Sequence, residues 1–432
     1  VLNDNKMSIS ENVGAMSRYL AKLRMSPKYA NFKGIIKKFC YAMPFIGEKL
    51  VDIADNAKTG LKSLVIGNSL FESMGLAYYG PFDGHDIKNL IDVFRSAKMR
   101  SRPVILHVVT EKGRGYKFAE DNPRGFHGVS PVRSSHTMNF ASVSGKKLCE
   151  IAAKNEKIIA VTAAMTDGVG LTEFSEKFPN RFFDAGIAEQ HAVDLAAGMA
   201  LGGLKPYFAV YSSFLQRAVD QIVIDVCIDK LPVTFLIDHS GFVEGDGITH
   251  QGLFDLSMLG GADGLVVASP MDGEHLKNLL DFSVKADFPL AIRYPKSYVC
   301  EIDGVDKTVT PFKWTLVRDC GSNTAILVHD SEMLSVAVKT SGADIIFATF
   351  VKPLDERFLS ENKYSRFIVP ENNIPEGGLA QCICAYFMHK NIDKEVIGLA
   401  IDKLPEYYDK ALCFEKYGLT TENLNNIINN RT

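Results

Sequence analysis

Short apolar runs alternate with longer stretches of helical spacing through the middle of this chain. Between about residues 139 and 310, five such runs are expected to be strands: Ile158–Val161, Tyr207–Tyr211, Val233–Ile237, Leu265–Ala268 and Leu290–Tyr294. Continuous apolar strands that alternate with helices are typical of a parallel sheet buried on both faces. The pattern therefore predicts an α/β domain whose sheet is covered by helices.

The same alternation returns between about residues 311 and 432. Four apolar runs predict strands there, at Ala325–Val328, Ile345–Phe350, Phe367–Val369 and Val396–Ala400. No repeat of short period and no low-complexity tract interrupts them. We expect a second α/β domain of the same general kind.

The first part of the chain has a different pattern. Residues 1–10 are expected to be a strand end and its loop, and residues 11–72 to be an α-helical excursion. The excursion is inferred from apolar residues three and four positions apart, such as Met16, Tyr19, Leu20 and Leu23. The run 104–109 predicts a buried strand, and the polar segment 124–138, with Gly, Pro and Ser, predicts a linker.

These patterns divide the chain into an incomplete first domain, a linker and two further α/β domains. The expected boundaries are 1–128, 129–138, 139–310 and 311–432. A length of 432 residues suits roughly two to four domains. We therefore expect three domains of mostly parallel sheet.

Composition excludes several classes of protein. The net charge is −3, from 48 basic and 51 acidic residues that are well interspersed, which gives no electrostatic case for binding nucleic acid. No apolar run approaches the length of a membrane span. The eight cysteines form no Cys-x-x-Cys pair, so a zinc ribbon or a thioredoxin-like site is not expected.

Glu189 is the most informative single residue. It lies in residues 184–191, Asp-Ala-Gly-Ile-Ala-Glu-Gln-His, between an aromatic strand at 181–183 and a helix of small residues from Ala192 to Ala200. Strand-to-helix junctions of α/β enzymes carry ligand-facing groups. The competing interpretation is a helix start, because a carboxylate in the first turn favours the positive end of the helix dipole.

Motifs on both sides of Glu189 resemble the 1-deoxy-D-xylulose-5-phosphate synthase family, a branch of the transketolase-like enzymes that depend on thiamine diphosphate. They cover nearly the whole chain. In chain order they are Val1-Leu-Asn3-Asp-Asn5-Lys-Met7-Ser-Ile9-Ser10, Gly80-Pro-Phe-Asp-Gly-His85-Asp, Glu111-Lys-Gly-Arg-Gly-Tyr116 with His127, Thr162-Ala-Ala-Met-Thr-Asp-Gly, Tyr211-Ser-Ser-Phe-Leu-Gln-Arg217, Glu244-Gly-Asp246-Gly-Ile-Thr-His250-Gln-Gly252, Ala291-Ile-Arg293-Tyr-Pro-Lys296 and Phe350-Val-Lys-Pro-Leu-Asp355.

The resemblance implies a three-domain transketolase-like fold and a transferase reaction. Pyruvate and D-glyceraldehyde 3-phosphate would condense to 1-deoxy-D-xylulose 5-phosphate with loss of CO₂, the first step of non-mevalonate isoprenoid synthesis and a source of thiamine and pyridoxal precursors. Thiamine diphosphate and Mg²⁺ would be the cofactors. A cytoplasmic homodimer of bacterial type is expected, and a plastid location stays open.

The resemblance also assigns cofactor contacts. Asn5 and the carbonyl of Met7 would ligate Mg²⁺, since that ion prefers oxygen donors. Ile9 and Phe214 would flank the cofactor, and Glu189 would face the aminopyrimidine. Taken alone, the Asn-Asp-Asn string is equally a turn, and Ile9 and Phe214 are equally core residues.

The remaining assignments concern the substrates. Tyr211, Arg217 and Arg293 would bind the acceptor phosphate, because a guanidinium is a planar, permanently charged donor. His250 and His127, together with Asp246, would contact hydroxyl and carbonyl oxygens and move protons. Asp246-Gly247 is alternatively a tight turn.

Two positions depart from the family pattern. Lys296 stands where Arg is usual, which keeps the charge but loses bidentate geometry, and His239 stands where Arg is common. Both departures bear on the affinity for the phosphosugar.

The chain opens on Val1 inside a motif. In the family, an Asp from an upstream Gly-Asp-Gly segment completes the metal site, so the sequence is expected to be roughly the C-terminal two-thirds of the enzyme. Three alternatives stay open: transketolase-type ketol transfer, a 2-oxo acid dehydrogenase β subunit, and a catalytically incomplete fragment that dimerises without binding cofactor.

Overall fold

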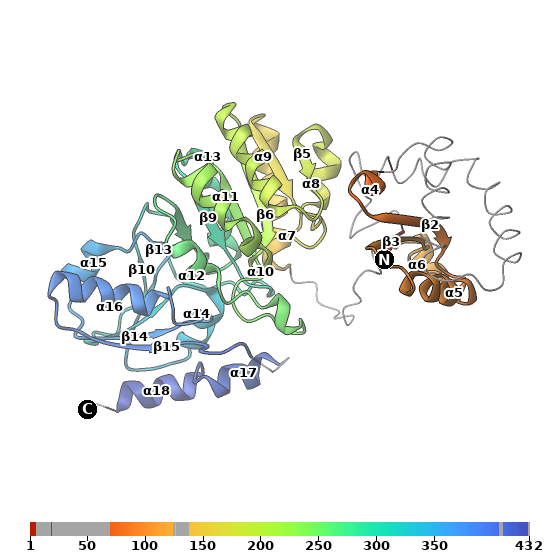
Figure 1. Cartoon of the computed structure of the whole chain (residues 1–432). Coiled ribbons are helices and arrows are strands. Elements are labelled where there is room, and N and C mark those ends of the chain that lie inside the picture. Colours follow the sequence, from red (N-terminus) through yellow and green to blue (C-terminus); the bar gives the residue numbers. More distant parts are fainter. Residues whose placement is uncertain (6–18, 20–69, 124–125, 127–137, 406–408, 431–432) are drawn as a thin grey trace, which may run out of the picture. The chain divides into compact units, whose positions relative to one another are not determined.

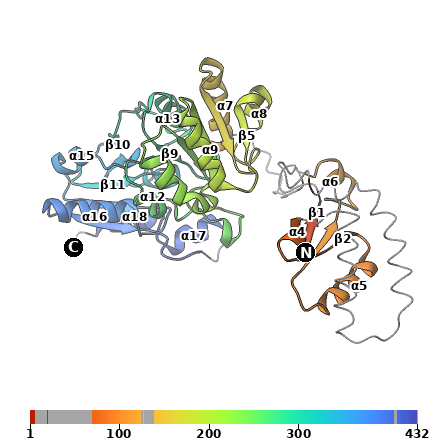
Figure 2. The same cartoon turned by 45° about the horizontal axis from the view of Figure 1, so that its top comes forward.

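The computed structural model describes residues 1–5, 19, 70–123, 126, 138–405 and 409–430. These fall into two compact units, Val1–Val132 and Arg133–Thr432, each drawn in Figures 1 and 2. The expected helical excursion at 11–72 and the expected linker at 124–138 lie almost entirely outside the described residues. No helix in the described ranges has the length and apolar character needed to cross a membrane.

The first unit contains a small parallel sheet in the order β1-β3-β2, formed by Leu2–Asp4, Val104–Val109 and Ala77–Asp83. The strand expected at 104–109 is confirmed. The helices among the described residues of this unit are α4 Leu70–Ser73, α5 Ile87–Lys98 and α6 Lys117–Asp121. Helix α5 begins where the carboxylate of Asp86 accepts the backbone N–H of Asn89, a side-chain N-cap.

The second unit is built on a seven-stranded sheet in the order β13-β8-β9-β7-β6-β4-β5 (Figure 1). Six strands are parallel: β4 Ile158–Thr162, β5 Phe182–Asp184, β6 Lys205–Tyr211, β7 Thr234–Asp238, β8 Val266–Ala268 and β9 Leu290–Arg293. Except in the edge strand β5, their side chains are buried almost throughout, as the continuous apolar runs predict.

Helices cover this sheet. The longer ones are α7 Phe140–Lys154, α9 Glu189–Leu201 and α13 Gly273–Lys285, with α7 against α13 and α9 against β6. The shorter ones are α8 Thr172–Lys177, α10 Ser212–Leu215, α11 Val219–Gln221 and α12 Asp255–Gly260, joined by a π-helical turn at Ile222–Cys227 and 3₁₀ turns at Pro179–Arg181, Gln216–Ala218 and Ile248–His250.

A five-stranded sheet follows in the order β10-β12-β11-β14-β15. Its strands are β10 Thr315–Arg318, β11 Thr324–Val328, β12 Asp344–Phe347, β14 Arg366–Pro370 and β15 Glu395–Leu399; all pair in parallel except β10. Its helices are α14 Ser331–Ala337, α15 Glu356–Glu361, α16 Leu379–Lys390, α17 Lys410–Lys416 and α18 Thr421–Asn429.

The single strand expected at 345–350 is wrong. Strand β12 ends at Phe347, and β13 Phe350–Lys352 pairs antiparallel with β8 in the other sheet. Every residue from 344 to 351 is buried, so hydrophobic periodicity could not locate the crossing between sheets. The antiparallel strands β10 and β13 were both outside the sequence prediction.

The order of the strands reverses direction at β4, and such a switch point is where a ligand-binding site is expected. From β4 the chain first forms β5 on one side and then β6 on the other. In open α/β sheets, ligands bind beyond the carboxyl ends of the strands at such a reversal. The loops after β4, β5 and β6 therefore converge where Glu189 and Tyr211 begin their helices.

Candidate active site

Glu189 is held at the switch point by the loop that follows β5. The Asp184 carboxylate accepts N–H groups of Ala164 (2.7 Å) and Gly186 (2.9 Å) and the hydroxyl of Thr166 (3.2 Å), which ties the ends of β4 and β5 together. Glu189 then opens helix α9 and is only 2% exposed.

The structure bears on both interpretations of Glu189, as a helix start and as a ligand-facing group. Its place in the first turn suits the helix dipole, and Ala188 gives the helix no side-chain cap. However, its buried Oε2 accepts no hydrogen bond from any residue that the structure describes. Helix capping does not account for a buried acceptor without a donor, because such a group costs free energy unless a ligand completes it.

Arg217 is the charged neighbour of this carboxylate. Its Nη1 lies 2.6 Å from Glu189 Oε2, an ion pair whose angles are poor for a hydrogen bond. The Arg217 side chain is 40% exposed, while that of Glu189 is 3% exposed. The guanidinium therefore closes the open side of the carboxylate and keeps donors free toward solvent.

Aromatic rings continue the site from the end of β6. Tyr211 stacks on His239 with ring centroids 3.8 Å apart and lies parallel to Phe214 at 6.0 Å. Phe214 in turn meets the edge of His250 at 5.3 Å. Residues from two motifs and the intervening His239 thus form one row, which brings the predicted Phe214, Tyr211 and His250 together.

The hydroxyl of Tyr211 remains protonated across the physiological range. Burial raises the pKa of Tyr211, and the carboxylates of Asp238, Asp246 and Asp167 raise it further. Gly168 makes room for this group, since a Cβ at that position would lie 2.0 Å from the Tyr211 oxygen. Tyr211 can therefore donate a hydrogen bond to an anionic ligand.

The loop from Gly241 to Leu253, here the 241–253 loop, carries Asp246 and His250. The Gln251 side chain fastens it from within: Oε1 accepts Val243 N–H at 2.8 Å, and Nε2 donates to the carbonyls of Val243 and Asp246. Asp246 pairs with Lys296 at 2.9 Å. Two of the predicted substrate residues therefore share an ordered loop, beside the lysine that departs from the family pattern.

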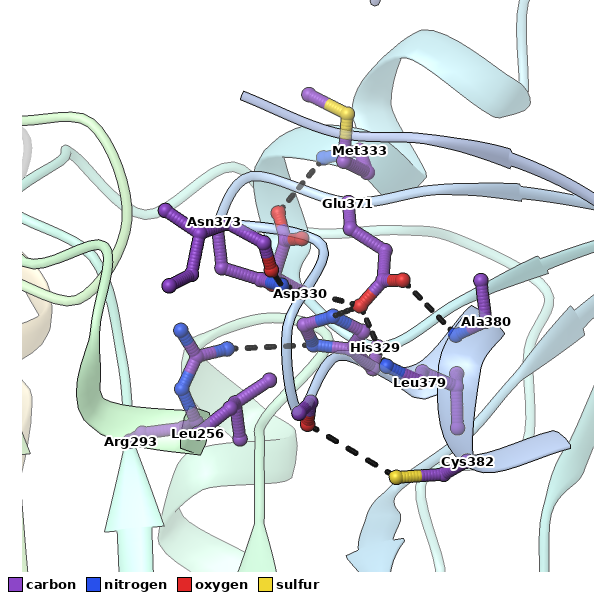
Figure 3. A network of polar contacts seen from close by, with 12 residues as sticks. Leu256, Arg293, His329, Asp330, Met333, Glu371, Asn373, Leu379, Ala380 and Cys382 are labelled. Atoms are coloured by element: carbon purple, nitrogen blue, oxygen red, sulfur yellow. Dashed lines mark hydrogen bonds and ion pairs between the residues drawn. The ribbon is translucent and has the colours of Figure 1, made fainter. Parts of the chain in front are cut away.

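The role of Arg293 in binding the acceptor phosphate stays a prediction, and in this structure its guanidinium contacts protein groups. Its Nε and Nη2 donate to Asp255 at 2.8 and 3.1 Å. Its Nη1 lies 3.2 Å from Nδ1 of His329 (Figure 3). Arg293 is 2% exposed and Asp255 is fully buried. Arg293 is thus enclosed by protein, whereas the side chains of Arg217 and Lys296 are partly exposed.

The remaining predicted residues belong to the first unit. Asn5 directly follows β1, and Met7, Ile9 and His127 lie outside the described residues. Within the described residues no three His, Cys, Asp or Glu side chains gather as a metal site. The metal and His127 assignments therefore stay predictions.

One polar group in the first unit had no sequence signal. His107 of β3 lies 3.0 Å from Asp4 Oδ2 through Nε2 and 2.6 Å from the Tyr78 hydroxyl through Nδ1, with all three buried. Asp4 is the last residue of β1 and precedes Asn5, so its contact with His107 holds β1 in place directly before Asn5. Only the fold reveals it, because the partners are 103 residues apart.

Comparison with known proteins identifies the class. Residues 136–301 match the transketolase pyrimidine-binding domain and 324–424 the transketolase C-terminal domain. Among solved structures, a split-gene transketolase described as an inactive beta4 tetramer aligns with a TM-score of 0.60 at 24% identity, over 68% of this chain and 97% of that one. Campylobacter jejuni transketolase aligns with a TM-score of 0.58 at 15% identity, over 85% and 70%. The fold is that of a transketolase-type α/β protein.

Closer relatives give the family. Residues 1–110 match the 1-deoxy-D-xylulose-5-phosphate synthase model. Synthases of that name from Clostridium tetani and Caldanaerobacter subterraneus are 42% and 41% identical to the chain, over 98% of it and 71% of their own length. That of Natranaerobius thermophilus is 40% identical over all of the chain and 72% of its own length. The chain belongs to the 1-deoxy-D-xylulose-5-phosphate synthase family.

Proposed function

We propose that this chain catalyses the condensation of pyruvate with D-glyceraldehyde 3-phosphate to 1-deoxy-D-xylulose 5-phosphate and CO₂, with Glu189 as the residue that activates thiamine diphosphate. The observation that carries the proposal is the buried Glu189 carboxylate at the sheet's switch point, whose Oε2 is paired with Arg217 at 2.6 Å but accepts no hydrogen bond from the described residues. A protonated ring nitrogen of an aminopyrimidine is the kind of donor that completes it.

The surrounding residues fit that group. Phe214 offers an aromatic face, and the buried Ser213 hydroxyl is a second polar atom without a partner among the described residues. When bound, thiamine diphosphate supplies the carbanion chemistry, and the protein supplies position and electrostatics. Glu189 would hold a proton at the ring nitrogen and so favour the reactive tautomer.

The acceptor substrate would meet the loop side of the site. Arg217 and Arg293 would bind its phosphate, Lys296 offers a partly exposed ammonium group, and the protonated Tyr211 hydroxyl adds a neutral donor. His250 and Asp246 on the 241–253 loop would bind the aldehyde's oxygens and move protons there. Because Asp246 holds Lys296 at 2.9 Å, the arriving phosphate would compete with that carboxylate for the ammonium group.

Further assignments belong to the same proposal. Asn5 and the Met7 carbonyl would ligate Mg²⁺, with Ile9 and His127 beside the cofactor and substrate. The domain boundaries 1–128, 139–310 and 311–432 and a homodimeric assembly are proposed with them. They rest on the family resemblance and on oxygen donors as the preferred ligands of Mg²⁺.

The test is CO₂ release from pyruvate in the presence of thiamine diphosphate and Mg²⁺. We expect release that rises strongly when D-glyceraldehyde 3-phosphate is added, and formation of 1-deoxy-D-xylulose 5-phosphate. A ketose phosphate in place of pyruvate should give no transfer; efficient transfer would instead favour transketolase activity. Absence of any pyruvate-dependent product with both cofactors present would contradict the proposal for this chain.

A matched pair of variants tests Glu189. Glu189→Gln keeps the size but removes the carboxylate's charge, and we expect loss of nearly all turnover, on the order of 10² to 10⁴-fold. Glu176→Gln, on the exposed surface of α8, is the control and should keep the parent rate. A Glu189→Gln variant as active as the control would refute the assignment.

A further inference from the structure

We infer that the loop between β14 and α16 (residues 371–378, here the β14–α16 loop) is a positioning element for the 241–253 loop, and that Asn372 is its main contact. The two loops come from different sheets and are far apart in the sequence. The role of Asn372 in catalysis rests on the proposed function, whereas its role in ordering the 241–253 loop does not.

Hydrogen bonds join the β14–α16 loop to both stems of the 241–253 loop. Asn372 Oδ1 accepts the backbone N–H of Phe242 at 2.9 Å, and Ile374 N–H donates to the carbonyl of Leu253 at 3.2 Å. The stems also pair with each other through Gly241 and Gly252, at 2.7 and 3.0 Å. The segment that carries Asp246 and His250 is therefore held at its base from outside its own sheet.

Packing supports the same contact. Phe242 and Leu253 are 1% and 0% exposed, and both belong to the apolar cluster formed mainly by the five-stranded sheet and its helices. The stems are thus anchored in the core of the neighbouring layer. Full burial of an apolar side chain of this size is favourable by about 1.5–3 kcal/mol relative to exposure to water.

The approach of the two loops depends on a glycine. Gly241 has φ +82°, and a Cβ there would lie 2.4 Å from Asn372 Nδ2 and 2.9 Å from the Asn372 carbonyl. A side chain would therefore meet backbone as well as a side-chain amide. The 241–253 loop and Asn372 are in contact at a distance that only glycine allows.

The β14–α16 loop is itself held firmly, so it can serve as a reference. The Glu371 carboxylate accepts N–H groups at the start of α16 from Leu379 (2.6 Å) and Ala380 (2.9 Å), and it also faces His329 at 3.3 Å (Figure 3). Asn372 Nδ2 donates to Glu332 Oε2 at 2.7 Å, and Glu332 pairs with Lys410. Both functional atoms of the Asn372 amide are used, one on each side.

The partners of His329 determine which of its ring nitrogens carries the hydrogen. Arg293 is a donor only, so Nδ1 of His329 must accept from it, and Nε2–H must donate to Glu371. The chain of contacts from Asp255 through Arg293 and His329 to Glu371 therefore has one consistent arrangement of protons. It links the end of β9 to the β14–α16 loop independently of Asn372.

The proposal predicts local loosening when the amide is removed. In Asn372→Ala, hydrogen exchange measured by mass spectrometry should become roughly tenfold faster in peptides that cover 241–253, since one net hydrogen bond is lost. Asn372→Asp keeps the size and the acceptor but places a second carboxylate against Glu332, and should also speed exchange. Asn426→Ala, on the exposed face of α18, is the control and should change nothing in these peptides.

A kinetic measurement separates positioning from simple structural support. We expect the KM for D-glyceraldehyde 3-phosphate to rise several-fold in Asn372→Ala, with pyruvate's KM close to the parent value. Unchanged exchange in 241–253, or acceleration spread evenly over the five-stranded sheet, would overturn the positioning role. If Asn372→Ala does not fold, Gly241→Ala tests the contact from the other side, and unchanged exchange there would equally overturn it. Absence of synthase activity in the parent protein, together with the expected exchange pattern in Asn372→Ala, would count against the proposed function alone.

Discussion

The buried pair between Arg293 and Asp255 gives a prediction that distinguishes its structural role from the substrate role expected from the sequence. Arg293 is 2% exposed and Asp255 is fully buried, and two hydrogen bonds of 2.8 and 3.1 Å join them. The pKa of Arg293 is raised above its ordinary value: burial has the largest single effect and lowers it, but the charge and hydrogen bonds of Asp255, with the charges of Asp330 and Glu371, together outweigh burial. Asp255→Asn would leave this buried cation without its main counter-charge.

Removing one partner of a buried ion pair typically costs about 3–5 kcal/mol, so we expect Asp255→Asn to lower the free energy of unfolding by that amount. Replacing both residues, as Asp255→Leu with Arg293→Met, should recover much of the loss because no unpaired member of the pair remains. Urea unfolding of the parent, each single variant and the double variant gives these values.

An exposed pair provides the control. Glu274 and Lys277 of α13 lie 2.9 Å apart with side chains 51% and 40% exposed, so Glu274→Gln should cost less than about 1 kcal/mol. The reasoning is refuted if Asp255→Asn costs no more than this control. If it did so while the KM for D-glyceraldehyde 3-phosphate rose in Arg293→Met, the guanidinium would serve the substrate after all.

Two further predictions follow from single residues. Burial lowers the pKa of His275 to about 4; Asp272 opposes this shift and Lys307 adds to it. The unfolded chain therefore binds the proton more tightly than the folded chain. The resulting stability is complete above about pH 6.5 and is lost as the pH falls toward 4, on the order of 3 kcal/mol in all. Urea unfolding at pH 7 and pH 5 should therefore show a smaller loss in His275→Gln than in the parent, and equal losses would contradict it. Gly168→Ala places a methyl group 2.0 Å from the Tyr211 oxygen and should raise the KM for the phosphorylated aldehyde at least several-fold, with Gly260→Ala, which meets no atom within 4 Å, as the control; equal KM values would show that Tyr211 does not depend on this space.

The sequence was sufficient for features with a local signal. The buried runs that became β4, β6, β7 and β9 are continuous and apolar, and the order of motifs brought Tyr211, Phe214 and His250 into one candidate site. The contacts of Arg293 had no such signal, because its partners, Asp255 and His329, lie 38 and 36 residues away. A charge pair of that separation is decided by which loops the fold places together, and no periodicity records it.

Strand β13 makes the seven-stranded sheet depend on a later part of the chain. Its residues, Phe350–Lys352, pair with β8 at the edge of that sheet, yet they are synthesised after β10, β11 and β12 of the five-stranded sheet. Lys352 also donates to carbonyls at the end of α12, including that of Gly260 at 2.9 Å. A piece ending near residue 310 would expose a bare strand edge, which is a template for aggregation. A gene divided near residue 310 would therefore be expected to give a first product that aggregates unless the second product is present to supply β13.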